Sequence, residues 1–209
     1  MITVLRQESA SSSSTVERQI EAEARAASAG DAGATTRLLA LLQPLVIRYC
    51  RARINRINGA LVLPEDVAQE IYLGILRALP TLCERRMPFL PFVYGIASHK
   101  VCDAVRAGAR NRADPVADTP DVSISDQEPE QLALNAELST RLGKLLDELP
   151  ARQKEVLVLR IVVGLSAAET ARAVGSTSGG VRVTQHRALT KLRSMVRADQ
   201  GLLAEGFAW

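Results

Sequence analysis

Residues 166–193 read SAAETARAVGSTSGGVRVTQHRALTKLR, and this pattern predicts two short helices joined by a turn. Ser166 followed by Glu169 is a capping box, in which each side chain satisfies a backbone N–H group at the start of a helix. Ala171 supplies the small residue, and Gly175 the turn residue, that two closely crossed helices need. The stretch therefore predicts a helix-turn-helix.

The second helix of this motif predicts a DNA-binding surface. Thr177 or Ser178 can cap its start. Its apolar positions recur at helical spacing and are Val181, Ala188, Leu189, Leu192 and Val196. The same spacing leaves basic side chains largely outside the core, namely Arg182, His186, Arg187 and Lys191. A basic amphipathic helix that stands alone is usually a solvated surface helix. Here the capping box, small residue, glycine turn and apolar anchor agree in spacing, which favours a helix for the major groove.

Composition and charge agree with a soluble protein that binds a polyanion. The chain has 209 residues, of which 47% are hydrophobic, so it can bury the cores of one or two domains. The formal net charge of +3 is unevenly distributed. Between residues 150 and 200 there are nine Lys or Arg but only three Asp or Glu. That end of the chain is expected to attract nucleic acid.

Several function classes are not supported by the sequence. Cys50, Cys83 and Cys102 are odd in number and have no CxxC spacing, so they predict neither a disulfide framework nor a zinc site. The sequence has no nucleophile and base set, no metal cluster and no glycine loop for phosphate, so neither an enzyme nor a cofactor is expected. No apolar run approaches the roughly 20 residues of a membrane span, and no signal peptide is visible. We therefore expect a cytoplasmic protein without a membrane partner.

The N-terminal half predicts a series of helices. Residues 1–26 contain a serine run without a strong apolar stripe, which predicts a disordered extension that becomes helical near Val16. Asp31 caps a helix, Pro44 opens another, and Gly59 ends it. Pro64 starts a helix that ends near residue 79, and a further helix runs from Phe92 to about Arg112.

The middle of the chain changes composition abruptly. Residues 114–130 contain six acids, three prolines and no basic residue, which predicts a flexible acidic linker over residues 113–132. After it, leucines at helical spacing and the run VLVLRIVVG from Val156 predict helices packed beneath the helix-turn-helix. No alternating strand pattern appears. The predicted fold class is all-α, with two helical domains joined by the linker.

Two stretches of the N-terminal half carry a family resemblance. The sequences LPEDVAQEIYLGILRAL (63–79) and FLPFVYGIASHKVCDAVR (89–106), together with the helix-turn-helix, resemble bacterial RNA polymerase sigma factors of the extracytoplasmic-function (ECF) group in the sigma-70 family. The sequences of these motifs are most similar to those of actinobacterial members, and the resemblance covers roughly residues 30–198. It implies a sigma region 2 domain over 27–112, a sigma region 4 domain over 133–200, and a C-terminal tail over 201–209.

The resemblance implies core RNA polymerase and promoter DNA as partners. Polymerase would be contacted through its clamp coiled coil and its flap, and the residues implied for the clamp are Asp66, Gln69 and Glu70. Their spacing of three and four places them on one side of a helix. Without the second motif, these side chains would be ordinary solvated residues. A flexible anionic linker could also occupy the positively charged nucleic-acid channels of polymerase.

Two sets of promoter-binding residues follow from the resemblance. The set implied for a flipped base and nearby phosphates of the −10 element is Arg85, Arg86, Met87, Phe92, His99, Lys100, Arg106 and Arg110. The chain departs from the family here, with Phe92 where tryptophan is frequent and His99 where asparagine is frequent, and Phe92 fits a buried core equally well. The set implied for the −35 element is Arg182, Val183, His186, Arg187 and Lys191. In that set Arg182 is expected to read guanine, and the other basic residues to contact phosphates.

Two other functions are compatible with parts of the pattern. A helix-turn-helix transcriptional regulator would bind duplex DNA by itself, commonly as a symmetric dimer, without being a polymerase subunit. An adaptor similar to an anti-sigma factor would bind polymerase or a sigma factor without reading DNA. The sequence leaves open whether an anti-sigma factor restrains this chain.

Overall fold

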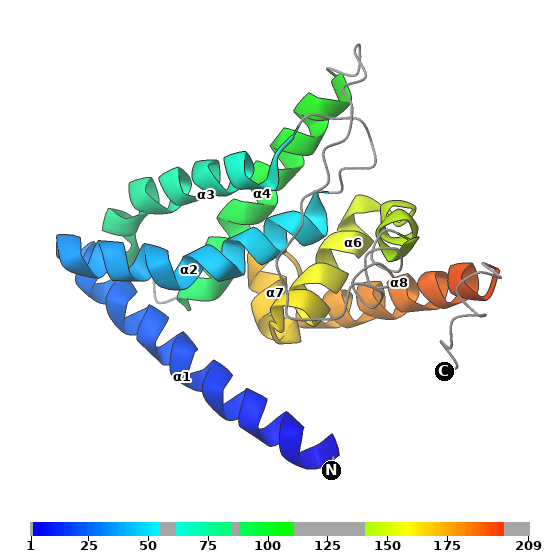
Figure 1. Ribbon diagram of the computed structural model, residues 1–209, viewed down its shortest axis with the longest axis horizontal. Helices are drawn as coiled ribbons and strands as arrows, with labels where there is room; N and C mark the ends of the chain where they lie inside the picture. The colour runs from blue at the N-terminus through cyan, green and yellow to red at the C-terminus, as the bar shows by residue number, and fades with distance from the viewer. Residues whose placement is uncertain (1, 55–61, 85–87, 111–140, 199–209) are drawn as a thin grey trace, which may run out of the picture.

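The protein is all-helical in the part of the chain that the structure describes. The computed structural model describes residues 2–54, 62–84, 88–110 and 141–198, and these ranges contain no strand. In chain order the elements are α1 (Ile2–Ser28), α2 (Ala32–Arg53), α3 (Pro64–Ala78), the 3-10 helix η2 (Leu79–Glu84), α4 (Phe89–Arg110), a helical stretch over 141–147, α6 (Ala151–Leu157), the π-helix η3 (Val158–Val163), α7 (Ala167–Ala173) and α8 (Ser178–Ala198) (Figure 1). The all-α fold class is confirmed. The predicted linker (113–132) and the predicted C-terminal tail (201–209) lie outside the described residues.

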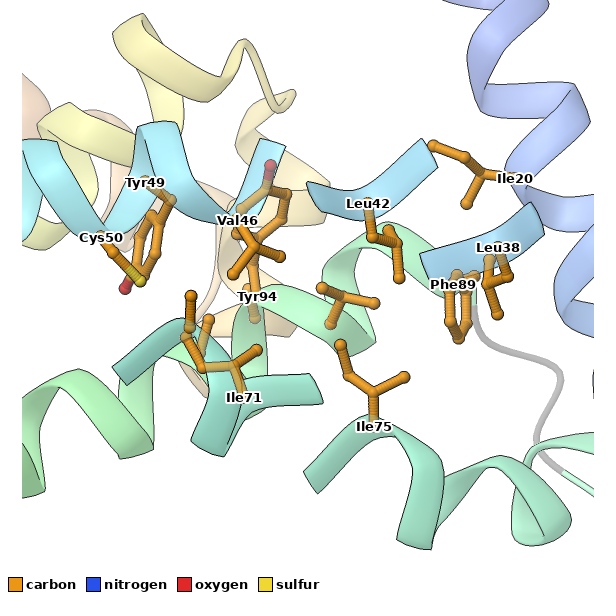
Figure 2. Close-up of a cluster of buried hydrophobic side chains, with 14 of the residues drawn as sticks. Ile20, Leu38, Leu42, Val46, Tyr49, Cys50, Ile71, Ile75, Phe89 and Tyr94 are labelled. Carbon is orange, nitrogen blue, oxygen red and sulfur yellow. The ribbon is translucent and has the colours of Figure 1, made fainter. Parts of the chain in front are cut away.

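Helices α1 to α4 form an N-terminal unit around α2. The buried face of α2 packs against α1, α3 and α4. Figure 2 shows apolar side chains of these helices meeting at the centre of the unit; the fully buried ones include Ile20, Leu38, Leu42, Val46, Ile71, Ile75 and Phe89. Each such side chain contributes on the order of 1.5–3 kcal/mol through burial. The sum holds α3 and α4 in fixed positions on α2.

One helix stands where the sequence predicted two. We expected Pro44 to open a new helix, but α2 runs without a break through Pro44 to Arg53, and this prediction was wrong. A proline inside a helix removes one backbone hydrogen bond and costs about 3 kcal/mol. Buried Leu42 and Val46 lie on either side of Pro44, so packing of the continuous helix offsets that cost.

The N-terminal segment also differs from expectation. Residues 2–28 form α1, so the helix predicted to begin near Val16 is present but starts earlier, within the extension predicted as disordered over 1–26. Ile20, Ala24 and Ala27 are buried against the N-terminal unit at a spacing of one helical turn. Small alanines give a weak apolar stripe, which is why the full length of the helix was not predicted. The chain reverses at Gly30, whose φ of 98° suits glycine, and the Asp31 carboxylate then caps α2 by accepting from the Ala34 N–H at 3.0 Å.

The boundaries of the next two helices were predicted closely. Helix α3 begins at Pro64 with Glu65 and Asp66 in its first turn, as the helix macrodipole favours, and ends at Ala78. Helix α4 begins at Phe89, three residues before the predicted start, and ends at Arg110. These two helices carry most of the residues that the family resemblance singled out in the N-terminal half.

Helices α6, α7 and α8 form a C-terminal unit with small cores of its own. Leu149, Leu157 and Ala188 make one of these cores. Val156 and Val181 make another together with Ala171. The buried segment predicted from Val156 is present, but the α-helix begins earlier, at Ala151, and continues from Val158 as a π-helix that ends at Gly164.

Candidate polymerase and promoter interface

The polar side of α3 is the first candidate surface. Asp66, Gln69 and Glu70 are all exposed, while the opposite side of the helix buries Val67, Ala68, Ile71 and Ile75. The structure therefore brings the three predicted polymerase-binding residues together on one exposed face. Leu73 lies one turn beyond Glu70 and is 44% exposed, which is unusual for a large apolar side chain. Leu73 was not predicted from the sequence, although its spacing of four from Gln69 and three from Glu70 could have indicated it.

An ion pair connects this face to α4. The Lys100 ammonium donates to the Glu70 carboxylate, with 3.0 Å between Nζ and Oε2. A second pair joins α2 to the first turn of α3, with 3.0 Å between Arg51 Nη2 and Glu65 Oε1. Both pairs are largely exposed, so each contributes about 0–1 kcal/mol. The pair of Glu70 with Lys100 affects the candidate surface, because the two residues were predicted to bind different ligands and here their charges neutralise each other.

Four of the eight residues predicted for the −10 element form one stripe along α4. Phe92, His99, Arg106 and Arg110 follow one another at spacings of seven and four, which places them on the same side of the helix. His99 and Arg106 are exposed. Arg106 approaches the neighbouring acid Asp103, with 3.8 Å between the charged atoms. Arg110 belongs to the last turn of α4, and nothing further is described of its side chain.

Phe92 has a mixed position. Its ring is partly buried against the N-terminal core and lies 6.2 Å from the ring of Phe89, centroid to centroid. One side of the ring therefore packs inside, and only the remainder can meet a base. Arg85, Arg86 and Met87 precede this helix and lie outside the described residues.

The helix-turn-helix forms as the sequence predicted. The Ser166 hydroxyl accepts from the Glu169 N–H at 3.2 Å, and the Glu169 carboxylate accepts from the Ser166 N–H at 2.8 Å, so the capping box is confirmed. Gly175 makes the turn with a φ of 61°. Thr177 caps α8 by accepting from the Gly180 N–H at 3.1 Å. Val181 is buried as the apolar anchor.

Helix α8 exposes the predicted DNA-reading residues. Arg182, Val183, His186 and Arg187 are all exposed in its first turns. Val183 is 50% exposed, which leaves an apolar contact available beside the basic groups. Arg160 of η3 was missed as a positioning residue: its guanidinium donates to the Gln185 side chain at 3.0 Å and to the Leu165 carbonyl. This contact joins the first turns of α8 to η3 and to the segment that follows it.

Lys191 has a structural partner. Its ammonium donates to the backbone carbonyl of Glu148 at 2.8 Å, so it holds α8 to the segment that precedes α6. The predicted role of Lys191 in contacting DNA is therefore shared with a role in packing the unit.

The described residues also bear on metal binding, membrane insertion and disulfide formation. The described residues contain no group of three or more His, Cys, Asp or Glu that could hold a metal ion. Among the same residues, no helix is both long enough and apolar enough to cross a membrane. Cys50 and Cys102 are free thiols. Burial, together with the negative charge of Glu65, raises the pKa of the Cys50 thiol to about 12.

Comparison with known proteins decides the family. The family profile for sigma-70 region 2 matches residues 38–111, and the profile for sigma-70, region 4 matches residues 139–192. The ECF RNA polymerase sigma factor SigD of Mycobacterium tuberculosis is 49% identical over 180 residues, covering 86% of this chain and 85% of that protein. The chain is an ECF sigma factor of the sigma-70 family. Its N-terminal unit contains region 2, and its C-terminal unit contains region 4.

A second relative agrees with this assignment. The ECF RNA polymerase sigma factor ShbA of Streptomyces griseus is 45% identical over 173 residues, covering 79% of this chain and 89% of that protein. The fold is also similar to a solved structure described as CnrH in complex with the cytosolic domain of CnrY. The TM-score is 0.63 at 23% identity, with 87% of this chain and 99% of that chain covered. A match to region 2 is not expected of a helix-turn-helix regulator, so this sigma factor is distinguished from that alternative.

Proposed function

We propose that this sigma factor binds core RNA polymerase and directs it to promoters with two elements, reading the −35 duplex with region 4 and melting and reading the −10 element with region 2. The observation that carries the proposal is that one chain matches both sigma-70 regions, and each unit exposes several of the residues implied for its ligand. The chain supplies no catalytic group in this account, because catalysis belongs to the polymerase.

Polymerase binding is assigned to the exposed face of α3. Asp66, Gln69 and Glu70 offer two carboxylates and an amide at helical spacing, and Leu73 adds an apolar contact at the same face. Interfaces commonly combine a small apolar centre with surrounding polar groups. A basic helix of the polymerase clamp would complement these carboxylates.

Reading of the −35 element is assigned to the first turns of α8. Arg182 follows the buried Val181 and projects from the helix end nearest the turn, where related motifs enter the major groove. Its guanidinium can donate to O6 and N7 of one guanine. His186 and Arg187 lie one turn further, where they can contact a second base or the flanking phosphates.

Reading of the −10 element is assigned to the stripe on α4. His99 can stack on or hydrogen-bond to an unpaired base, and Arg106 can pair with a phosphate of the single strand. Lys100 joins them if its ion pair with Glu70 opens. Because both implied functions meet at that pair, polymerase contact and strand contact would be coupled there.

Run-off transcription tests the proposal. Purified core polymerase would be incubated with the full chain on promoter fragments, and separate fragments would carry substitutions in the −35 or the −10 element. We expect transcripts only when chain, polymerase and both elements are present. Specific duplex binding by the chain alone as a symmetric dimer, with no transcription, would instead support a conventional regulator.

A further inference from the structure

Helix α4 begins without a capping side chain in its own sequence. Pro88 precedes Phe89, the first residue of α4, and its side chain has no oxygen that could accept from the N–H groups of the first turn. The first turn of α4 also contains no acidic residue. Because Pro91 has no N–H group, the donors without an intrahelical acceptor are those of Phe89, Leu90 and Phe92. These donors need an acceptor from another part of the chain or from water.

Glu21 of α1 supplies one of these acceptors. Its carboxylate accepts from the Phe89 N–H, with 2.6 Å between Oε1 and the backbone nitrogen, across 68 positions of sequence. A hydrogen bond to an ionised acceptor is roughly twice as strong as one between neutral groups. The negative charge also complements the positive end of the α4 macrodipole. Glu21 therefore caps α4 from a different helix.

Both partners of this hydrogen bond are held in place by the core. Ile20, directly before Glu21, is fully buried, and Ala24 follows it one helical turn later on the same buried face. The Phe89 side chain is 1% exposed and belongs to the same apolar cluster as Ile20 (Figure 2). The cap therefore lies between two segments that are each anchored in the N-terminal unit.

The capped turn carries the first residue of the −10 stripe. Phe92 lies in this turn, and its ring is 6.2 Å from the Phe89 ring, centroid to centroid. Without the cap the Phe89 N–H loses its acceptor, which favours fraying of the turn that holds both rings. His99 and Arg106 lie about two and four turns further along α4, where the intrahelical hydrogen bonds do not depend on the cap. The effect of Glu21 therefore falls on the Phe92 end of the stripe.

Helix α1 lies outside the part of the chain that matches the family profile. The profile for region 2 starts at residue 38, in α2, and so does not include Glu21. Even so, α1 packs against both η2 and α4, the elements on either side of residues 85–88. We propose that Glu21 is a positioning residue for −10 recognition, which acts by capping the turn of α4 that carries Phe92. This inference rests on the proposed function and adds α1 to the −10-reading part of the chain.

Amide hydrogen exchange of the full chain, followed by NMR, tests the cap without polymerase. Glu21→Ala removes the acceptor, whereas Glu21→Gln keeps an acceptor oxygen without the charge. We expect the Phe89 amide to exchange about fivefold faster in Glu21→Ala, as for the loss of a typical helix cap, and at an intermediate rate in Glu21→Gln. Glu23→Ala is the matched control, because it removes a carboxylate of the same helix that pairs with Arg37 of α2 and not with α4. Equal exchange of the Phe89 amide in Glu21→Ala and wild type would overturn the proposal.

Binding of the reconstituted holoenzyme to two DNA probes tests the link to −10 recognition. One probe is a fork junction that has a single-stranded −10 element and no −35 element, and the other is a duplex with the −35 element alone. We expect Glu21→Ala to bind the fork about fivefold more weakly than wild type and the −35 duplex equally well. Glu21→Gln should recover part of the loss, and Glu23→Ala should bind both probes as wild type does. Equal weakening on both probes would show a general structural effect and would refute the positioning role.

The wild-type chain separates failure of this inference from failure of the proposed function. If wild type and Glu21→Ala bind the fork equally well, Glu21 has no positioning role and the sigma function stands. If wild-type holoenzyme binds neither probe, the proposed function itself fails. Helix content by circular dichroism accompanies both measurements. If Glu21→Ala lost helicity throughout the chain, Glu21→Gln would decide, since it removes only the charge, and fork binding equal to wild type would then refute the proposal.

Discussion

Replacement of Arg182 by alanine should selectively remove −35 recognition. Arg182 is exposed in the first turn of α8, beside the buried anchor Val181, and forms no ion pair with any described residue. Its loss should therefore leave the free energy of unfolding within about 0.5 kcal/mol of wild type. If the guanidinium reads one guanine through two hydrogen bonds, the loss is about 1–3 kcal/mol, or roughly 5- to 150-fold in affinity for the specific duplex.

The assay is binding of the reconstituted holoenzyme to promoter fragments at several salt concentrations. Arg197→Ala is the matched control, because it removes the same exposed charge from the last turn of α8, about 22 Å along the helix from Arg182. We expect Arg182→Ala to lose discrimination at one base pair and Arg197→Ala to keep it. Equal weakening on specific and unrelated DNA would show that Arg182 contacts only phosphate, and an unchanged affinity would refute its placement in the groove.

Three other perturbations have defined outcomes. Glu70→Gln removes the exposed pair with Lys100, so we expect less than about 1 kcal/mol loss of stability but about fivefold weaker binding in a titration with core polymerase; equal binding would remove Glu70 from the interface. Gly175→Ala places a residue with a Cβ at a φ of 61° and should lower the free energy of unfolding by about 1–2 kcal/mol, measured by thermal unfolding. The control Gly179→Ala lies in open space on α8 at an ordinary φ and should raise the free energy of unfolding by up to about 1 kcal/mol. Similar melting temperatures for the two variants would contradict the turn geometry. Because folding raises the pKa of the Cys50 thiol, the thiol contributes stability that is fully present below pH 9.0 and is lost between pH 9.0 and about 12. The free energy of unfolding of Cys50→Ala, measured by chemical unfolding, should therefore depend on pH less steeply than that of wild type across that window, by about 1.4 kcal/mol per pH unit. Parallel curves for the two proteins would show that the thiol does not titrate with folding.

The helix-turn-helix was predictable because its signals are local. The capping box of Ser166 and Glu169, the turn at Gly175 and the cap at Thr177 each depend on residues within four positions of one another. The bounds of α3 followed from Pro64 and the apolar stripe for the same reason. Local rules therefore located the elements that carry the candidate sites in both regions.

The errors arose where tertiary packing overrode a local preference. Pro44 was expected to start a helix, yet the continuous burial of α2 retains it inside one. The full length of helix α1 was not predicted because its buried stripe consists mostly of alanines, which contribute little to an apolar pattern. The π-helix at Val158–Val163 has no sequence signature that distinguishes it from an α-helix.

The contact between Tyr49 of region 2 and Glu155 of region 4 could not be predicted from the sequence. Glu155 is separated from Tyr49 by 106 positions, and a single acid in a basic segment carries no indication of a distant partner. In the same way, only the structure shows that Lys191 bonds to the Glu148 carbonyl and that Phe92 is partly committed to the core. Long-range pairs of this kind depend on how complete helices pack, which local spacing does not encode.

A promoter footprint of the reconstituted complex shows whether the chain makes polymerase recognise the −35 element and open the −10 element. Core polymerase would be combined with the full chain on one promoter fragment, with nuclease protection measured at the −35 element and permanganate reactivity of unpaired thymines at the −10 element. We expect both signals to appear together when chain and polymerase are present, and neither signal with polymerase alone. Protection by the chain without polymerase at a symmetric site, or polymerase-dependent protection without strand opening at −10, would refute the assignment of promoter recognition to this chain.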